Sequence, residues 1–260
     1  MPLMLPIKDI IDEAMGIKSF VFEHILGAKP GQFVMLWIPG FDMKPMSVAF
    51  DEGTQFIVTI SAVGPFSQKI CSMKKGDFVG VMGPFGTHFS MKGENVALVG
   101  GGYGTAPLAF LAEERKKKGM ESYLIVGART KDLLLFQERT KIKKIKTYYA
   151  TNDGSFGFKG FNTELFEELL GREKIDRVMT CGPELMMKRV LDICVAHKIP
   201  CEVSIERYMK CGIGICGTCC VDPLGMRMCT EGPIVSGEIA QKVTEFGKYH
   251  RDRFGIGHEF

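Results

Sequence analysis

Cys211-Gly-Ile-Gly-Ile-Cys216-Gly-Thr-Cys219, followed by Cys229, is the most distinctive stretch of the sequence. Its spacing, C-x4-C-x2-C with a later fourth cysteine, is that of plant-type [2Fe-2S] sites. The glycines between the thiols let the backbone approach inorganic sulfide without a Cβ clash. Because such a cluster carries one electron at a time, we expect the rest of the chain to provide the sites at which electrons enter and leave.

Two alternatives concern the occupant and the ligands of this site. Pairs of cysteines spaced C-x2-C are also common in structural zinc sites, so a zinc ion is the competing occupant. Cys220 directly follows Cys219 and would lengthen the x2 spacing to x3 if it were the ligand. The spacing favours Cys219, with Cys220 left as a spare thiol. The predicted cluster ligands are therefore Cys211, Cys216, Cys219 and Cys229.

The composition is that of a globular protein in a reducing compartment. Nine cysteines, an odd number gathered toward the C-terminus, favour metal ligation over a disulfide framework. The net charge of +3 gives no reason to expect nucleic acid or an anionic membrane as a partner. The N-terminus carries no secretion signal, and glycines interrupt the uncharged run 96–112. We therefore expect a cytoplasmic protein without a membrane span.

Short apolar bursts separated by turn residues fill the first part of the chain. They recur from Phe20 to Met82, and Gly, Pro and Asp stand between them. This pattern is typical of a small antiparallel β-barrel. We assign the barrel to residues 1–92.

After Gly93 the sequence alternates between strand and helix patterns. This alternation predicts a doubly wound parallel sheet, an α/β domain that we assign to residues 93–200. The basic run 139–146 is expected to lie on its solvated surface. A further strand at 201–206 leads into the cysteines, and residues 201–260 are assigned to a cluster-binding segment with a tail. The strands are predicted at 96–99, 121–127, 146–150 and 177–181, and the helices at 105–118, 162–170 and from 182–183 to about 197.

A glycine-rich turn between the first strand and helix of this domain is a candidate nucleotide contact. Gly101, Gly102 and Gly104 would let backbone N–H groups approach a pyrophosphate at the helix N-terminus. The turn differs from the G-x-G-x-x-G pattern because Pro107 stands where the last glycine would lie. A plain tight turn is therefore the alternative.

A second candidate lies where the fourth strand of the domain ends. Cys181, followed by Gly182 and Pro183, stands at the edge where open α/β sheets bind ligands. Its small polarizable thiol is a candidate to pack against a nicotinamide ring. A buried cysteine with no such role is the alternative.

Together these segments resemble a known family. The order of barrel, glycine-rich domain and Cys-Gly-Pro-x-x-Met-Met segment at 181–187 resembles the ferredoxin–NADP reductase superfamily. The stretch 204–219, with Cys229-Thr-Glu-Gly-Pro233 after it, resembles the electron-transfer subunit of NAD-dependent (class B) dihydroorotate dehydrogenase. The likeness extends over residues 5–240 and is most specific in the cysteine segment.

The resemblance implies an FAD site in the barrel. The R-P-x-S segment of the family holds FAD, and lysine in place of arginine keeps a positive charge for the flavin pyrophosphate but lacks the bidentate fork. A second flavin loop has Phe-Ser where many members have Gly-Thr, and its serine retains a hydroxyl. The matching residues are Lys44, Pro45, Met46 and Ser47 for the first segment, and Thr59, Ile60, Ser61, Phe66 and Ser67 for the second.

The resemblance also implies a function and a partner. An FMN-containing catalytic subunit would oxidise dihydroorotate, and electrons would pass singly through the cluster to FAD and then as a hydride to NAD. A heterotetramer with two copies of each subunit is expected. The alternatives are a reductase subunit that serves ferredoxin, a sulfur reductase or a hydrogenase, and a non-catalytic zinc protein with a vestigial nucleotide fold. The residues 128–130 after the second strand of the α/β domain do not distinguish NAD from NADP.

Overall fold

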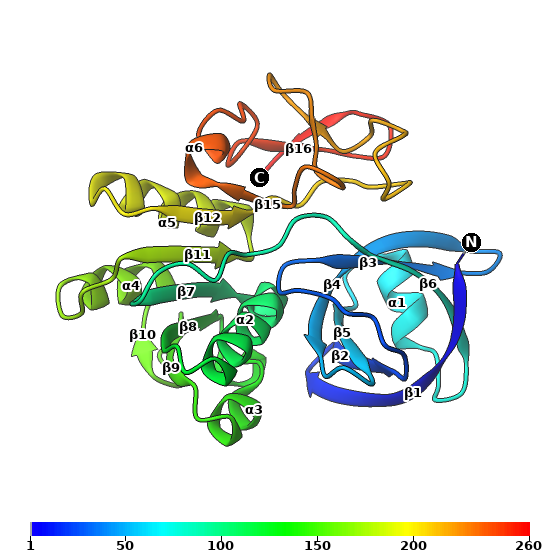
Figure 1. Ribbon diagram of the computed structural model, residues 1–260, viewed down its shortest axis with the longest axis horizontal. Coiled ribbons are helices and arrows are strands. Elements are labelled where there is room, and N and C mark those ends of the chain that lie inside the picture. The colour runs from blue at the N-terminus through cyan, green and yellow to red at the C-terminus, as the bar shows by residue number, and fades with distance from the viewer. Residues whose placement is uncertain (1) are drawn as a thin grey trace.

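The computed structural model describes residues 2–260. A β-barrel and a domain built on a parallel sheet lie side by side, and the C-terminal segment extends over both (Figure 1). The predicted fold class, a barrel plus an α/β domain, is confirmed. Within residues 2–260, no helix is long and apolar enough to cross a membrane.

Six antiparallel strands close into the barrel in the order β1-β2-β5-β4-β3-β6. Closure pairs the backbone groups that an open sheet would leave exposed at its edges. The first strand was not predicted, although it pairs with both β2 and β6. The strands are β1 (Leu3–Ala14), β2 (Ile17–Phe22), β3 (Phe33–Ile38), β4 (Asp42–Asp51), β5 (Phe56–Ser61) and β6 (Phe78–Phe85), and the short helix α1 (Pro65–Cys71) connects β5 to β6.

The second domain contains a seven-stranded sheet in the order β10-β9-β8-β7-β11-β12-β15. All neighbouring strands are parallel except β15, which pairs antiparallel with β12. Both β12 and β15 lie in residues 201–260, so the sheet continues into the segment that carries the cysteines. The strands are β7 (Val96–Gly101), β8 (Ser122–Ala128), β9 (Lys146–Thr151), β10 (Phe158–Lys159), β11 (Arg177–Cys181), β12 (Cys201–Ser204) and β15 (Ile234–Ser236).

Helices and small hairpins complete the fold. The helices α2 and α4 contact the central strands of the sheet, and α5 contacts β11 and β12. Two hairpins lie outside the main sheet, one within the cysteine segment and one in the C-terminal tail. The helices are α2 (Thr105–Lys117), α3 (Gln137–Ile142), α4 (Asn162–Leu170), α5 (Glu184–Ala196) and α6 (Gly237–Ala240), the 3-10 turns are η1 (Gly102–Gly104) and η2 (Lys131–Leu133), and the hairpins are β13 (Cys220–Val221) with β14 (Met226–Arg227) and β16 (Tyr249–Arg251) with β17 (Gly257–Glu259).

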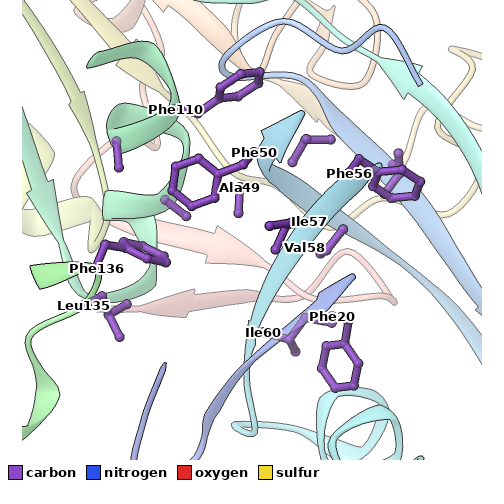
Figure 2. Packing of buried hydrophobic residues seen from close by; sticks show 14 of the residues in the cluster. Phe20, Ala49, Phe50, Phe56, Ile57, Val58, Ile60, Phe110, Leu135 and Phe136 are labelled. Atoms are coloured by element: carbon purple, nitrogen blue, oxygen red, sulfur yellow. The ribbon is translucent and has the colours of Figure 1, made fainter. Parts of the chain in front are cut away.

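Aromatic side chains join the barrel to the α/β domain. The Phe50 ring of β4 lies 6.3 Å from that of Phe110 on α2 and 5.4 Å from that of Phe136 (Figure 2). The Arg139 guanidinium lies 3.5 Å from the centre of the Phe50 ring and forms an ion pair with Glu113. The basic run predicted to be solvated therefore begins with a residue of this junction, which fixes the two domains against each other.

The strand order reverses next to β7, and this reversal determines where a ligand can enter. From β7 the chain continues to β8 and β9 on one side of the sheet, and then returns to β11 on the other side. In open α/β sheets, ligands bind outside the carboxyl ends of the strands at such a point. Gly100 and Cys181 are directly paired there, which brings the two predicted nucleotide segments together.

Candidate functional site

One cavity of about 590 Å³ opens between the barrel, the glycine turn and the segment before the cysteines. This volume falls in the range of sites for cofactors and other small molecules. Residues of β4, β5 and α1 form its barrel side. All nine residues matched to the FAD segments of the family line this cavity, namely Lys44, Pro45, Met46, Ser47, Thr59, Ile60, Ser61, Phe66 and Ser67.

Two of the residues predicted to bind FAD, Ser67 and Thr59, form hydrogen bonds within the barrel through their hydroxyl groups. The Ser67 hydroxyl accepts a hydrogen bond from the Gly64 N–H at 2.9 Å and donates to the Gly64 carbonyl at 3.0 Å. The hydroxyls of Thr59 and Ser19 lie 2.7 Å apart in a buried pair. Ser67 and Thr59 therefore shape the wall of the cavity, while their hydroxyl groups stabilise the barrel.

Lys44 connects the barrel wall to the segment that carries the cysteines. Its ammonium donates to the Tyr208 hydroxyl at 2.6 Å and forms an ion pair with Asp42 at 2.9 Å. Partial burial disfavours the charged amine, but the hydrogen bonds to Tyr208 and Asp42 prevail and raise the pKa of Lys44. Tyr208 precedes Cys211 by three positions, so this charged contact joins the cavity to the cysteine loop.

Several residues that the sequence did not identify also line the cavity. Tyr103 lies inside the predicted glycine turn, and residues 206–209 lie just before Cys211. Their closeness in sequence to predicted site residues could have identified them. His250 comes from the tail hairpin, where no local pattern marked it. These residues include Tyr103, Glu206, Arg207, Tyr208, Met209 and His250.

Most of the glycines predicted to bind a nucleotide are required by close packing between the turns after β7 and β11. A Cβ at Gly104 would lie 2.5 Å from the Cα of Gly182, and a Cβ at Gly101 would lie 2.7 Å from the Met186 sulfur. Gly102 differs, because it has a φ of +54° and no atom within 4 Å of its Cβ position. Of these residues only Gly104 lines the cavity. The segments after β7 and β11, including Pro183, are therefore held together at the carboxyl edge of the sheet.

Replacing Gly104 with alanine is expected to lower the free energy of unfolding by about 1–3 kcal/mol, because the added methyl group must displace the backbone of Gly182. Urea denaturation measures this change. Gly171→Ala is the matched control, because the nearest atom to a Cβ there is a carbonyl oxygen at 3.4 Å. Equal stability of the two variants would show that the turns can separate without cost.

Cys181 lies beneath the carboxyl edge of the sheet and does not line the cavity. Its side chain is 1% exposed. Burial, and then the charge of Glu206, raise the pKa of this thiol, so it stays protonated at neutral pH. A contact between Cys181 and a nicotinamide ring stays a prediction, and such a contact would involve packing by a neutral thiol.

The four predicted ligand cysteines gather in one loop as two pairs. Cys216 lies within hydrogen-bonding reach of Cys211, and Cys219 within reach of Cys229. The Gly214 N–H donates to the Cys229 sulfur at 3.2 Å, and the Thr218 hydroxyl donates to the Cys216 sulfur at 3.3 Å. These donors stabilise negative charge on sulfur, as a thiolate-bound cluster requires.

The arrangement of the thiols bears on the two alternatives for this site. Two pairs suit two irons better than one tetrahedral zinc. Cys219 is 2% exposed and lies within hydrogen-bonding reach of Cys229, whereas Cys220 is partly exposed and begins strand β13. The geometry therefore favours Cys219 over Cys220.

The cysteine loop packs directly against the wall of the cavity. A Cβ at Gly212 would lie 2.8 Å from the side chain of Met35 on β3. Phe33 and Met209 both line the cavity and belong to the apolar cluster that includes Cys219 and Cys229. A second cavity of about 720 Å³ at the amino ends of β11 and β12 contains none of the predicted site residues. Phe33 and Met209 thus link the first cavity to the apolar cluster in which two of the four thiols lie.

Comparison with known proteins identifies the family. A family profile described as the iron-sulfur cluster binding domain of dihydroorotate dehydrogenase B matches residues 206–240. A protein of Methanocaldococcus jannaschii, named a probable dihydroorotate dehydrogenase B (NAD(+)) electron transfer subunit, is 48% identical over 98% of this chain and 97% of its own. The chain belongs to the family of dihydroorotate dehydrogenase B electron-transfer subunits. A Pyrococcus furiosus protein of the same name is 40% identical over 94% of each chain, and the family predicted from the cysteine segment is confirmed.

Solved structures show that proteins outside this family share the fold of the chain. The structure of an NADH-dependent reduced ferredoxin-NADP oxidoreductase is similar, with a TM-score of 0.83, 29% identity and coverage of 95% of both chains. A ferredoxin NADP+ reductase of Neisseria gonorrhoeae, solved with bound FAD and NADP, has a TM-score of 0.63 at 18% identity over 75% of this chain and 90% of its own. The second likeness concerns the fold alone.

Proposed function

We propose that this chain passes electrons from the FMN of a dihydroorotate dehydrogenase catalytic subunit, through a [2Fe-2S] cluster and FAD, to NAD+ in pyrimidine biosynthesis. The observation that carries the proposal is that Phe33 and Met209 line the cavity and belong to the same apolar cluster as Cys219 and Cys229. It allows a one-electron centre and a flavin to be neighbours in one chain. We further propose a heterotetramer with two copies of each subunit, in the cytoplasm.

Each cofactor is assigned to residues of this chain. Cys211, Cys216, Cys219 and Cys229 would hold the cluster, and the nine cavity residues of β4, β5 and α1 would hold FAD. The turns with Gly101, Gly102, Gly104, Gly182 and Pro183 would receive NAD, with Cys181 beneath the nicotinamide. When bound, the flavin supplies the conversion between single electrons and a hydride. The protein contributes an apolar cavity with few polar groups, which suits the flavin ring.

The outer side of the cysteine loop supports docking of the partner subunit. Cys216 is exposed, and the neighbouring apolar side chains of Ile213 and Ile215 are 51% and 79% exposed. An apolar surface rimmed by polar residues is typical of a protein interface. A partner seated there would exclude water from the cluster and bring its own flavin near the thiols.

Reconstitution tests this function directly. The chain, purified anaerobically, should contain about two irons, two sulfides and one FAD, and with the catalytic subunit it should couple dihydroorotate oxidation to NAD+ reduction. A colourless chain that contains zinc would refute the cluster. Turnover with ferredoxin but not with dihydroorotate and the catalytic subunit would favour the alternative reductase, to which the similarity with the NADH-dependent oxidoreductase also points.

Replacing Lys44 with alanine is expected to weaken FAD binding about 10- to 100-fold, because a charged hydrogen bond contributes about 1.5–3 kcal/mol. Fluorescence titration of the chain with FAD measures the affinity. Lys8→Ala is the control, because its exposed ammonium pairs with Glu23 outside the cavity. Unchanged flavin affinity would remove Lys44 from the FAD site and leave it only its contacts with Tyr208 and Asp42.

A further inference from the structure

Glu206 is a carboxyl group at the centre of the site without an assigned role. It lines the cavity, and its side chain is exposed. Among residues 2–260, no hydrogen bond or ion pair engages its carboxylate, and Arg207 contacts only its backbone carbonyl. A ligand that fills the cavity would cover the side of Glu206 that now faces water.

The neighbours of Glu206 favour its protonated form. Burial and the charge of Glu184 raise its pKa, and Arg207 opposes them. Arg207 is itself occupied, because its guanidinium binds Glu184 at 2.7 Å and Glu245 at 2.6 Å. The titratable and charged groups around Glu206 are Tyr103 of the glycine turn, Cys181 of β11, Glu184 of α5, Arg207 and Tyr208 of its own segment, Lys44 of β4 and His250 of β16.

The charge of Glu206 acts on two residues of the segments that are proposed to bind NAD. Its negative charge is the main reason why the pKa of Tyr103 is raised to about 12, and it also raises the pKa of Cys181. Tyr103 belongs to the turn after β7, and Cys181 ends β11. Glu206 therefore shares the cavity with Tyr103 of the turn that is proposed to receive NAD.

The proposed reaction needs a proton at this place. An iron–sulfur cluster delivers electrons without protons, and reduction of a flavin to its anionic two-electron form consumes two electrons and one proton. Transfer of a hydride to NAD+ then removes both electrons and that hydrogen together. Each pair of electrons that arrives through the cluster thus requires one proton inside the cavity, whereas reduction of the flavin by NADH requires none.

We propose that Glu206 is the proton-relay residue for flavin reduction through the cluster. Its carboxyl O–H bond breaks as the proton passes to the flavin, and the carboxylate regains a proton from water at the mouth of the cavity. In the reverse direction, the carboxylate accepts the proton when electrons leave singly. This inference rests on the proposed function, because it requires both the flavin and the cluster.

The test separates the two ways of reducing the flavin in the full chain with its cofactors. In Glu206→Gln, the rate of reduction by NADH, which requires no proton from the protein, is the reference for the second rate. Reduction by the one-electron donor reduced methyl viologen, entering through the cluster, should slow roughly 100-fold and lose its pH dependence, as expected when general acid catalysis is removed. Glu206→Asp should restore part of the rate, and Glu238→Gln, exposed on α6, should change neither rate.

A stability measurement on the chain without cofactors gives an independent readout. The raised pKa of Glu206 means that the folded chain holds this proton above the usual carboxyl pKa of 4.5, so its ionisation destabilises the fold as the pH rises. Glu206→Gln should therefore raise the melting temperature at pH 8, with the gain vanishing toward pH 4.5.

The outcomes are distinct. Equal loss of both rates in Glu206→Gln would overturn the relay and assign Glu206 to cofactor binding. An unchanged rate and pH profile with methyl viologen would overturn it as well. Failure of NADH to reduce the flavin of the wild-type chain would instead refute the proposed function.

Discussion

Replacing Cys229 with serine is expected to remove the cluster and abolish electron transfer between the partner and the flavin, while FAD stays bound. Cys229 is 1% exposed and lies next to Cys219. A serine hydroxyl ionises far less readily than a thiol and is a poor iron ligand, so one iron would lose half of its protein ligands. Cys229 does not line the cavity, and flavin binding should therefore survive.

Three measurements on the anaerobically purified variant check this expectation. Iron and sulfide should fall from about two per chain to near zero, the visible absorption should become that of a flavin alone, and NADH should still reduce the flavin. Cys220→Ser is the matched control, because the neighbouring thiol is more exposed than Cys219 and is not a predicted ligand, and it should retain the cluster. Loss of the cluster in Cys220→Ser but not in Cys219→Ser would exchange the ligand assignment.

Local patterns sufficed for most of the fold. The strands of the α/β domain are apolar because both faces of a parallel sheet are covered, and their bounds lie within a few residues of the prediction. Strand β1 was missed because most of its side chains are exposed, with only Leu5 and Ile7 buried. Its charged and proline-containing sequence forms a strand because it pairs with β2 and β6. These contacts between strands cannot be predicted from the periodicity of the sequence.

The candidate site divides in the same way. The residues matched to the FAD segments of the family line one cavity. They lie there together because β4 and β5 are neighbouring strands and α1 follows β5. Glu206 and His250 come from segments that meet the cavity only in the folded chain. For the glycines, the sequence suggested a role that close packing also explains. Gly104 and Gly182 were assigned to a ligand, yet their contact with each other already requires the absence of a side chain.

Replacing Arg207 with methionine is expected to lower the free energy of unfolding by about 3–5 kcal/mol, the largest stability effect that we predict. The Arg207 side chain is 3% exposed and binds Glu184 and Glu245, whose side chains are 8% and 0% exposed. Methionine fills a similar volume but leaves two buried carboxylates without their shared cation, and removal of one partner from a buried ion pair costs about this much. Urea denaturation measures the change.

The control for this variant is an ion pair of the same types on the surface. Arg189 and Glu167 are 58% and 43% exposed, and Arg189→Met should cost less than about 1 kcal/mol. The double variant Arg207→Met/Glu245→Gln should recover part of the loss, because only one buried carboxylate would then lack its cation. If Arg207→Met were as stable as Arg189→Met, the three buried charges would not hold the tail to α5. The position of His250 beside the cavity would then need another cause.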